Sequence, residues 1–301
     1  MTPSQDRDRR VRDRGPRAGR HRGSEGQETF ADAFTALGRI AYAGAQVSAS
    51  ALDLNSGNAL LAIDDHVALP TAGVGKVLLL IEVSARLTES DSAGFDILEK
   101  AEVDLVGNAG LWRHLQAPAL PLADLATLVG ATGDNLATNA LLRHVGLDAV
   151  RLRAESLGLA RTALLDRERD RRGPDDAPHL SVGSTAELSR LFGALSRGRV
   201  VDSATSRRVL GWLSLGADLS LVASAFGLGP LAHRSAEHGV QVVNITGTGV
   251  GVRSEAGLLY GPRSAAAYAV TVQFDDVDLP ARLRVLEAFR TVGAALIEHV
   301  H

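Results

Sequence analysis

The stretch Leu69–Leu80, "LPTAGVGKVLLL", carries a single lysine where a glycine-containing segment meets a run of aliphatic residues. The aliphatic run predicts a buried helix over residues 73–88. Each glycine inside a helix costs roughly 1 kcal/mol relative to alanine, and a cation in the first turn opposes the positive end of the helix dipole by about 0.3–1 kcal/mol. The composition of this stretch therefore indicates a purpose other than helix stability.

Lysine is rare in this protein. Of the 32 residues that are Lys or Arg, only Lys76 and Lys100 are lysine. Since a generic surface cation would almost always be arginine here, Lys76 is better explained by what arginine cannot do, which is to lose its proton when desolvated or to fit as a compact ammonium. The alternative is a lysine whose stem lies along a helix end and whose charge reaches water.

Composition predicts one globular domain behind a polar tail. The chain has 301 residues, 45% of them hydrophobic, and a net charge of −3, so nothing indicates a nucleic-acid partner. Residues 1–28 contain eight arginines, five acids and no apolar run, which predicts a disordered tail before a domain over 29–301. No segment reaches the length of a membrane span. No apolar core of a signal peptide follows Arg9-Arg10, so the chain as given is expected in the cytoplasm.

Several kinds of chemistry have no matching motif. The chain has no cysteine, and its nine histidines show no metal-ligand spacing, so we expect no metal and no cofactor. A phosphate-binding loop fails at Pro70 and Val77, where it needs glycine and Ser or Thr. "GTGVG" at 247–251 lies between two predicted strands and does not open a helix, so it does not predict dinucleotide binding.

The order of the predicted elements indicates an α+β fold. A helix and a hairpin around Asn55-Ser56-Gly57 come first, a mostly helical part covers about 95–200, and three strands and a long helix complete the chain. We therefore expect an antiparallel sheet built from both ends of the chain and flanked by helices, with an all-helical lobe inserted. The cleft between lobe and sheet is the expected site.

Three short motifs in this order resemble those of the class A β-lactamases and the related penicillin-binding proteins, which are serine hydrolases. These enzymes carry S-x-x-K at the start of a buried helix, S-D-N in the helical lobe and K-T-G on a strand. The matching stretches here are "GVGK" (73–76), "GDN" (133–135) and "ITG" (245–247). The resemblance covers roughly residues 30 to 300 and implies the β-lactamase-like form of the α+β fold.

The motifs are degenerate where the family's chemistry depends on them. Gly73 stands at the position of the nucleophilic serine, Gly133 at that of the proton-relaying serine, and Ile245 at that of the third-motif lysine. The resemblance therefore implies that serine acyl transfer is lost. If a replacement nucleophile exists, Thr71 or Ser254 is the candidate.

Other positions of the family pattern remain. The resemblance implies that Lys76 and Asn135 contact one another and the ligand amide, that Asp134 mainly caps the motif loop, and that the Thr-Gly pair binds a carboxylate or presents backbone to it. Backbone N–H groups of Gly73 and Thr248 would form the oxyanion hole. The remaining candidate ligand-binding residues are Asp134, Asn135, Asn139, Thr246, Gly247 and Thr248.

The family's deacylating glutamate lies in a D-R-x-E context. In "LDRERDRRGPDDAPHL" Arg169 falls at that glutamate position and Glu168 lies one residue early. We expect Glu168 to miss the site unless the loop shifts its register.

Two functions follow from this pattern. The first is a pseudoenzyme or partner protein that binds a small carboxylate-bearing or peptide-like ligand, and the second is an enzyme with altered chemistry in which Lys76 acts as base. If Lys76 survives only from lost chemistry, Lys76→Met is expected to leave the melting temperature unchanged or raise it. Restoring Gly73→Ser, Gly133→Ser and Ile245→Lys together is expected to allow slow acylation.

Overall fold

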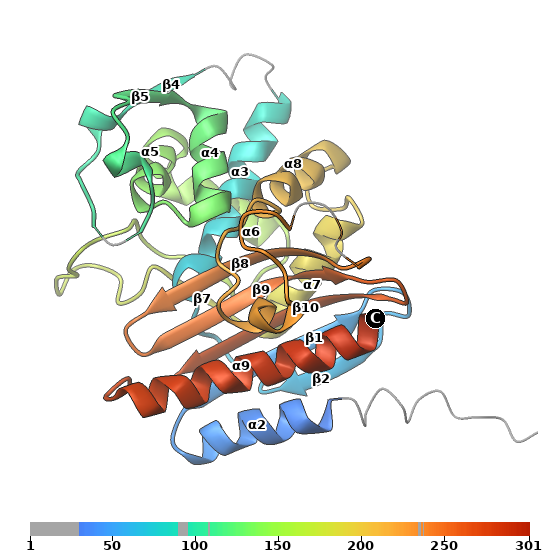
Figure 1. Cartoon of the computed structure of the whole chain (residues 1–301). Coiled ribbons are helices and arrows are strands. Elements are labelled where there is room, and N and C mark those ends of the chain that lie inside the picture. Colours follow the sequence, from blue (N-terminus) through green and yellow to red (C-terminus); the bar gives the residue numbers. More distant parts are fainter. Residues whose placement is uncertain (1–29, 90–95, 108, 234–235, 237) are drawn as a thin grey trace, which may run out of the picture.

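The computed structural model describes residues 30–89, 96–107, 109–233, 236 and 238–301. The tail predicted over 1–28 lies outside these residues. The described chain forms a central sheet, helices on both faces of it, and a lobe of helices beside its edge (Figure 1).

The central sheet is built from both ends of the chain, as predicted. Its five antiparallel strands have the order β2-β1-β10-β9-β8. The N-terminal β1 pairs with the C-terminal β10 from Gln46–Gln273 to Asp53–Ala266. The strands are β1 (Gln46–Asp53), β2 (Ala59–Ile63), β8 (Gln241–Gly249), β9 (Val252–Tyr260) and β10 (Ala265–Gln273). Strand β8 is an edge strand, and this edge borders the helical lobe.

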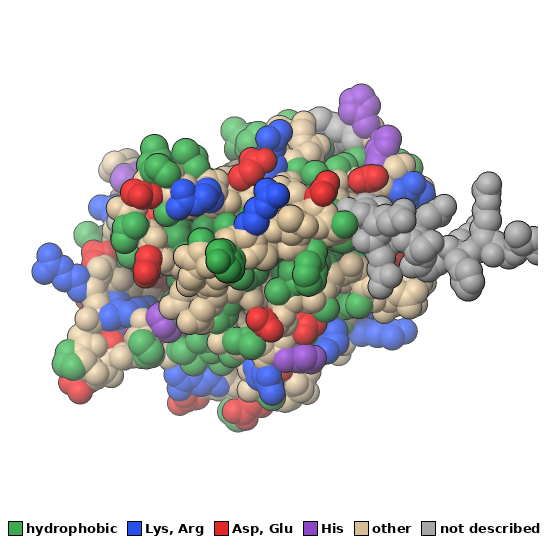
Figure 2. Space-filling view, turned by 90° about the horizontal axis from the view of Figure 1, so that it is seen from below, with side chains coloured by type: hydrophobic (Ala, Val, Ile, Leu, Met, Phe, Trp, Pro, Cys, Tyr) green, Lys and Arg blue, Asp and Glu red, His purple; other side chains and the backbone are tan. Residues whose placement is uncertain are grey.

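Helices α2 (Ala31–Tyr42) and α9 (Leu279–Val300) cover one face of the sheet (Figure 1). Their buried residues pack with the alternate side chains of β10 that point to this face, such as Tyr268 and Val270. Seen from the side of these helices, acidic, basic and apolar side chains are interspersed, and the described residues form no large patch of one charge (Figure 2).

Helix α7 (Thr185–Ser196) lies on the opposite face of the sheet, although it falls inside the range expected for the helical lobe. The β10 residues that point this way, Ala267 and Ala269, are small and let the helix approach closely. Hydroxyl pairs tie α7 to β1, including Ser50 Oγ to Ser189 Oγ at 2.9 Å.

The lobe is built around α3. Helix α8 lies just beyond the expected range of 95–200 and packs against α3 and α4. The lobe helices are α3 (Lys76–Glu89), α4 (Leu122–Thr132), α5 (Asn135–Val145), α6 (Leu147–Ser156) and α8 (Ser203–Leu213). The short strands are β3 (Leu69–Pro70), β4 (Ile97–Glu99), β5 (Ala119–Pro121), β6 (Ala163–Leu164) and β7 (Ser181–Gly183). The 3₁₀ helices are η1 (Ala72–Gly75), η3 (Lys100–Glu102), η4 (Trp112–His114) and η5 (Val222–Phe226).

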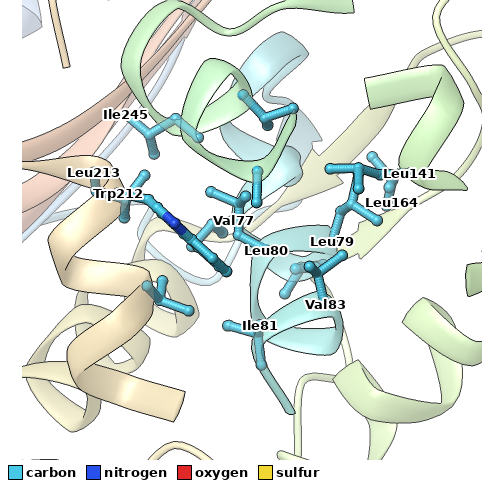
Figure 3. Close-up of a cluster of buried hydrophobic side chains, with 14 of the residues drawn as sticks. Val77, Leu79, Leu80, Ile81, Val83, Leu141, Leu164, Trp212, Leu213 and Ile245 are labelled. Atoms are coloured by element: carbon cyan, nitrogen blue, oxygen red, sulfur yellow. The ribbon is translucent and has the colours of Figure 1, made fainter. Parts of the chain in front are cut away.

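Helix α3 is buried over most of its length. The aliphatic run that predicted it packs against Leu141 of α5, Leu164 of β6, Trp212 of α8 and Ile245 of β8 (Figure 3). Every residue of α3 from Lys76 to Ala85 is buried, and its apolar side chains share one core with residues of the lobe and of the sheet. Neither α3 nor any other helix of the described residues combines the length and apolarity needed to cross a membrane.

A fully buried carboxylate joins the sheet to η5. Glu255 of β9 accepts hydrogen bonds from the N–H of Val222 at 2.7 Å, from Asn244 Nδ2 at 2.9 Å and from the Tyr268 hydroxyl at 2.7 Å. Burial raises the pKa of Glu255 to about 7, and the hydrogen bonds from Tyr268, Asn244 and the backbone oppose this rise.

Glu255 should make the stability of the protein depend on pH. The folded state binds this proton more tightly than the unfolded chain, where the pKa is near 4.5. Its contribution to stability is therefore complete below that value and is lost as the pH rises through about 7. We expect the free energy of unfolding, measured with urea, to fall by roughly 2 kcal/mol between about pH 5 and about pH 8. Glu255→Gln should flatten this dependence, and equal pH slopes in both proteins would contradict the assignment.

Candidate functional site

Close approach of backbone explains the glycines that precede Lys76. A Cβ added to Gly75 would lie 2.2 Å from Ser181 Cβ on β7, and one added to Gly73 would lie 2.8 Å from the carbonyl oxygen of Thr246 on β8. On the other side of this contact, a Cβ on Gly247 would lie 2.1 Å from the carbonyl oxygen of Thr71. Glycine lowers helix stability, but it is necessary here because η1 packs closely between strands β7 and β8.

Ala72 holds a strained backbone immediately before Gly73. Its φ is +47°, in the left-handed region, which costs a residue with a Cβ roughly 1–2 kcal/mol. The Ser181 hydroxyl donates to the Ala72 carbonyl at 2.7 Å and helps to fix this geometry. Strain of this kind clusters at functional sites, and here it sets the backbone of Gly73 against β8.

A cleft of about 270 Å³ lies between the lobe and β8. The predicted site residues that line it are Gly73, Lys76, Gly133, Asn135, Glu168, Ile245, Thr246 and Thr248. A larger cavity of about 500 Å³ lies near Arg143 and Arg167 and shares only Asn139 with the predicted site residues. Because the motif positions converge on the smaller cavity, we assign the site to it.

Lys76 is a buried residue of the cleft wall, and its ammonium group has three partners. Its Nζ donates to the carbonyl oxygen of Gly133 at 2.7 Å and to Asn135 Oδ1 at 2.8 Å, and it lies 2.7 Å from Glu168 Oε1. The predicted contact between Lys76 and Asn135 is thus present. Three acceptors match the three donors of an ammonium group, so the lysine joins α3 to the loop before α5 and to the segment that contains Glu168.

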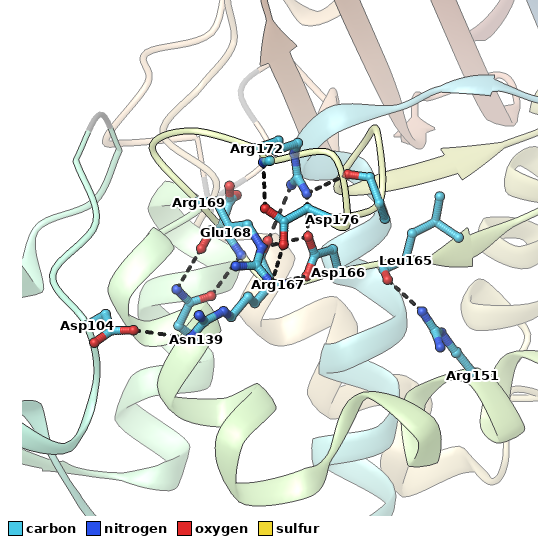
Figure 4. Close-up of polar contacts among 12 residues, drawn as sticks. Asp104, Asn139, Arg151, Leu165, Asp166, Arg167, Glu168, Arg169, Arg172 and Asp176 are labelled. Atoms are coloured by element: carbon cyan, nitrogen blue, oxygen red, sulfur yellow. Dashed lines mark hydrogen bonds and ion pairs between the residues drawn. The ribbon is translucent and has the colours of Figure 1, made fainter.

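The expectation that Glu168 misses the site is wrong. Its carboxylate reaches Lys76 because Asn139 of α5 holds the backbone on both sides: Asn139 Nδ2 donates to the Glu168 carbonyl at 3.0 Å, and the Glu168 N–H donates to Asn139 Oδ1 at 2.8 Å (Figure 4). Asn139 does not line the cleft. It positions Glu168, which sequence comparison alone placed one residue too early.

Arg169, which the sequence resemblance aligns with the family's glutamate, makes its ion pairs within its own loop. Its guanidinium lies 2.8 Å from Asp166 and 3.0 Å from Asp176 (Figure 4). Burial alone would raise the pKa of Asp166, but hydrogen bonds from Arg169, the Arg167 N–H and Arg172 outweigh it and lower the pKa. These contacts make the loop compact. Glu168 is the residue of this loop that places a carboxylate in the cleft.

The second motif is mainly structural. Asp134 caps α5 by accepting from the Ala137 N–H at 2.9 Å, and its other oxygen accepts from the N–H groups of Leu111 and Trp112. The predicted capping role is confirmed, and Asp134 does not line the cleft. Gly133 ends α4 with a φ of +62°, a conformation that favours glycine.

The third motif presents a different surface from the one the family pattern implies. Ile245 is buried and packs near Trp212 and Leu213, with only part of it bordering the cleft (Figure 3). The hydroxyl of Thr246 donates to Asp218 Oδ2 at 2.6 Å. Gly247 faces η1 and does not line the cleft. Asp218 cannot be recognised from the sequence, because no motif marks the loop between α8 and η5.

Neither candidate for a replacement nucleophile reaches the cleft. Thr71 is 1% exposed and shares a hydrogen bond of 2.7 Å with Ser181, while Ser254 is fully buried and shares one of 2.8 Å with Thr271. Both hydroxyls belong to packed strand and turn contacts.

A sheet built from both chain ends, with a helical lobe and a lysine at the cleft between them, is the architecture of the β-lactamase-like serine hydrolases. Residues 29–300 match the model of the beta-lactamase enzyme family, so the chain belongs to this family. No curated protein sequence matches the chain significantly.

Solved structures show the same fold at low sequence identity. A β-lactamase from Sphaerobacter thermophilus is 22% identical, with a TM-score of 0.76 over 90% of this chain and 97% of that one. A class A β-lactamase from Mycobacterium abscessus is 17% identical, with a TM-score of 0.69 over 85% and 97% of the two chains. A variant of PBP-A, solved as an acyl-enzyme complex with penicillin G, is 18% identical, with a TM-score of 0.72 over 89% and 96%.

Proposed function

We propose that this protein does not carry out serine acyl transfer and that it binds a small ligand in the cleft without a covalent step. The observation that carries this proposal is at position 73, where glycine replaces the nucleophilic serine and a Cβ would lie 2.8 Å from the Thr246 carbonyl oxygen. Any side chain at this position forces backbone to move. The packing of the cleft therefore requires glycine at position 73, and glycine has no side chain that could act as a nucleophile.

The environment of Lys76 supports the same proposal. Its three acceptors are the carbonyl of Gly133, the amide of Asn135 and the carboxylate of Glu168, and none of them is a serine hydroxyl. A lysine that activates a serine needs that hydroxyl within hydrogen-bond reach. In this cleft Lys76 instead connects α3 to the start of α5 and to the loop that contains Glu168.

Backbone groups keep the cleft able to bind a ligand. Gly73 lies in the first turn of η1, where N–H groups have no partner inside the helix. Thr248 is exposed on the edge strand β8, and both residues border the cleft. Two backbone donors of this kind can hold a carbonyl oxygen, and they do not depend on the lost side chains.

A second candidate function is hydrolysis with altered chemistry, and Glu168 is the observation that favours it. Its carboxylate lies in the cleft and keeps 17% of its side-chain surface exposed. A carboxylate so placed can act as a general base toward a water molecule. Lys76 was the expected base in this alternative, but its donors are all engaged, which favours Glu168 for that role. Amide or ester hydrolysis that is lost in Glu168→Gln, with no covalent intermediate, would favour this candidate.

The proposal predicts no reaction with β-lactams. Loss of a nucleophile typically lowers the rate on the order of 10⁶-fold, so turnover of a chromogenic cephalosporin should not exceed the background reaction. Intact mass spectrometry after incubation with penicillin G should show no added mass. An adduct of one penicillin per chain would contradict the proposal.

A further inference from the structure

The position of Asp218 changes the charge of the subsite beside the third motif. Thr246 has one hydroxyl proton, and it donates this proton to Asp218 Oδ2 at 2.6 Å. The next residue along the strand toward the N-terminus is the uncharged Ile245. A ligand carboxylate at this place would therefore meet a carboxylate and a hydroxyl that is already engaged.

The cations of the cleft do not offset this negative charge. Among the described residues that line it, the cations are Lys76 and Arg169. Lys76 is paired with Glu168, and Arg169 is paired with Asp166 and Asp176. No ion pair within the described residues involves Asp218, which is exposed at the cleft.

Asp218 is held in place but is not saturated. Its Oδ1 accepts from the Ser220 N–H at 3.0 Å, and its backbone carbonyl accepts from Asn244 Nδ2 at 3.1 Å. A carboxylate offers about four lone-pair positions, and the bonds from Ser220 and Thr246 use two of them. The remaining positions can accept hydrogen bonds from a ligand.

We propose that Asp218 makes this subsite select a cationic group, an amine or an amidine, in place of the carboxylate that the family pattern implies. This inference rests on the proposed non-covalent ligand binding in the same cleft. The ligand that fits has a positive group at Asp218 and an oxygen acceptor within reach of the backbone N–H groups of Gly73 and Thr248. Attraction between opposite charges and a charge-assisted hydrogen bond would hold it there.

Two probes of equal size and opposite charge test the inference. Isothermal titration calorimetry at low salt should show benzamidine binding at least about tenfold more tightly than benzoate, since a hydrogen bond between charged groups is worth roughly that factor. Asp218→Asn keeps an oxygen for Thr246 and should remove the preference. Asp218→Lys should reverse it. The control is Asp148→Asn on α6, a carboxylate that is 93% exposed and does not line the cleft, and it should retain the preference.

The outcomes separate this inference from the proposed function. Equal affinities for the two probes, binding of neither, or a preference that persists in Asp218→Asn would overturn the cationic subsite. Thermal melts show that each variant is folded before it is titrated. A penicillin adduct would instead overturn the proposed function, and the relative affinities of the two probes would still report on Asp218.

Discussion

Lys76→Met should lower the free energy of unfolding by roughly 3 kcal/mol, because breaking a buried ion pair leaves an uncompensated charge. The Lys76 side chain is 3% exposed and that of Glu168 is 17% exposed, so the loss falls near the lower end of the range for buried pairs, about 3–5 kcal/mol. Methionine keeps the apolar stem but leaves Glu168, Asn135 and the Gly133 carbonyl without their donor.

This expectation reverses the one drawn from sequence. A lysine left over from lost chemistry, with no partner, would cost stability, and its removal would be neutral or favourable. The structure contradicts that premise, because Glu168 lies 2.7 Å from Lys76 Nζ. The lysine now stabilises the cleft whether or not it still takes part in a reaction.

Chemical denaturation of two lysine variants measures the effect. Lys100→Met is the matched control, since Lys100 is the second of the two lysines. Its ammonium donates to the Leu115 carbonyl and lies 5.6 Å from the Trp112 ring centre, contacts worth up to about 1 kcal/mol at a partly exposed site. Adding Glu168→Gln to Lys76→Met should recover part of the loss, because the unpaired charge is removed. Equal stability of Lys76→Met and wild type would show that the pair contributes nothing.

The parts of the fold that follow from local patterns could be predicted from the sequence. The aliphatic run after Lys76, the hairpin and the three late strands each carry their own periodicity. The pairing of β1 with β10 follows once the strands from both ends of the chain are expected in one sheet. The sequence does not show that helix α7 packs on the sheet. Its amphipathic pattern indicates that one face is buried, but it does not indicate which element covers that face.

Site contacts made by loops were harder to predict. The capping role of Asp134 is predictable because capping is local in sequence. The sequence predicts Glu168 outside the site because it lies one residue early in the D-R-x-E context, and no local pattern shows that Asn139, 29 residues away, holds its backbone at the cleft. Asp218 carries no sequence signal, because its partner Thr246 is 28 residues away and no spacing links the two. Long-range side-chain contacts leave no periodic signal.

The variant that restores all three motif side chains, Gly73→Ser with Gly133→Ser and Ile245→Lys, should be destabilised and should not be labelled by a fluorescent penicillin. The sequence predicted slow acylation, but it could not show the 2.8 Å contact between a Cβ at position 73 and the Thr246 carbonyl oxygen. Overpacking of this kind typically costs about 1–3 kcal/mol. A serine at the φ of +62° found for Gly133 adds roughly 1 kcal/mol.

Single Gly→Ser variants separate the steric effect from the chemistry. Gly38 on α2 has nothing within 4 Å of its added Cβ, so Gly38→Ser should leave the melting temperature unchanged or raise it slightly, whereas Gly73→Ser should lower it by several degrees. In-gel fluorescence of the triple variant, with the Gly38→Ser protein as the unreactive reference, measures labelling. A labelled band in the triple variant would contradict this prediction. It would show that β8 can move away from η1 and that position 73 can carry a nucleophile. The three side-chain replacements alone would then account for the lack of acylation.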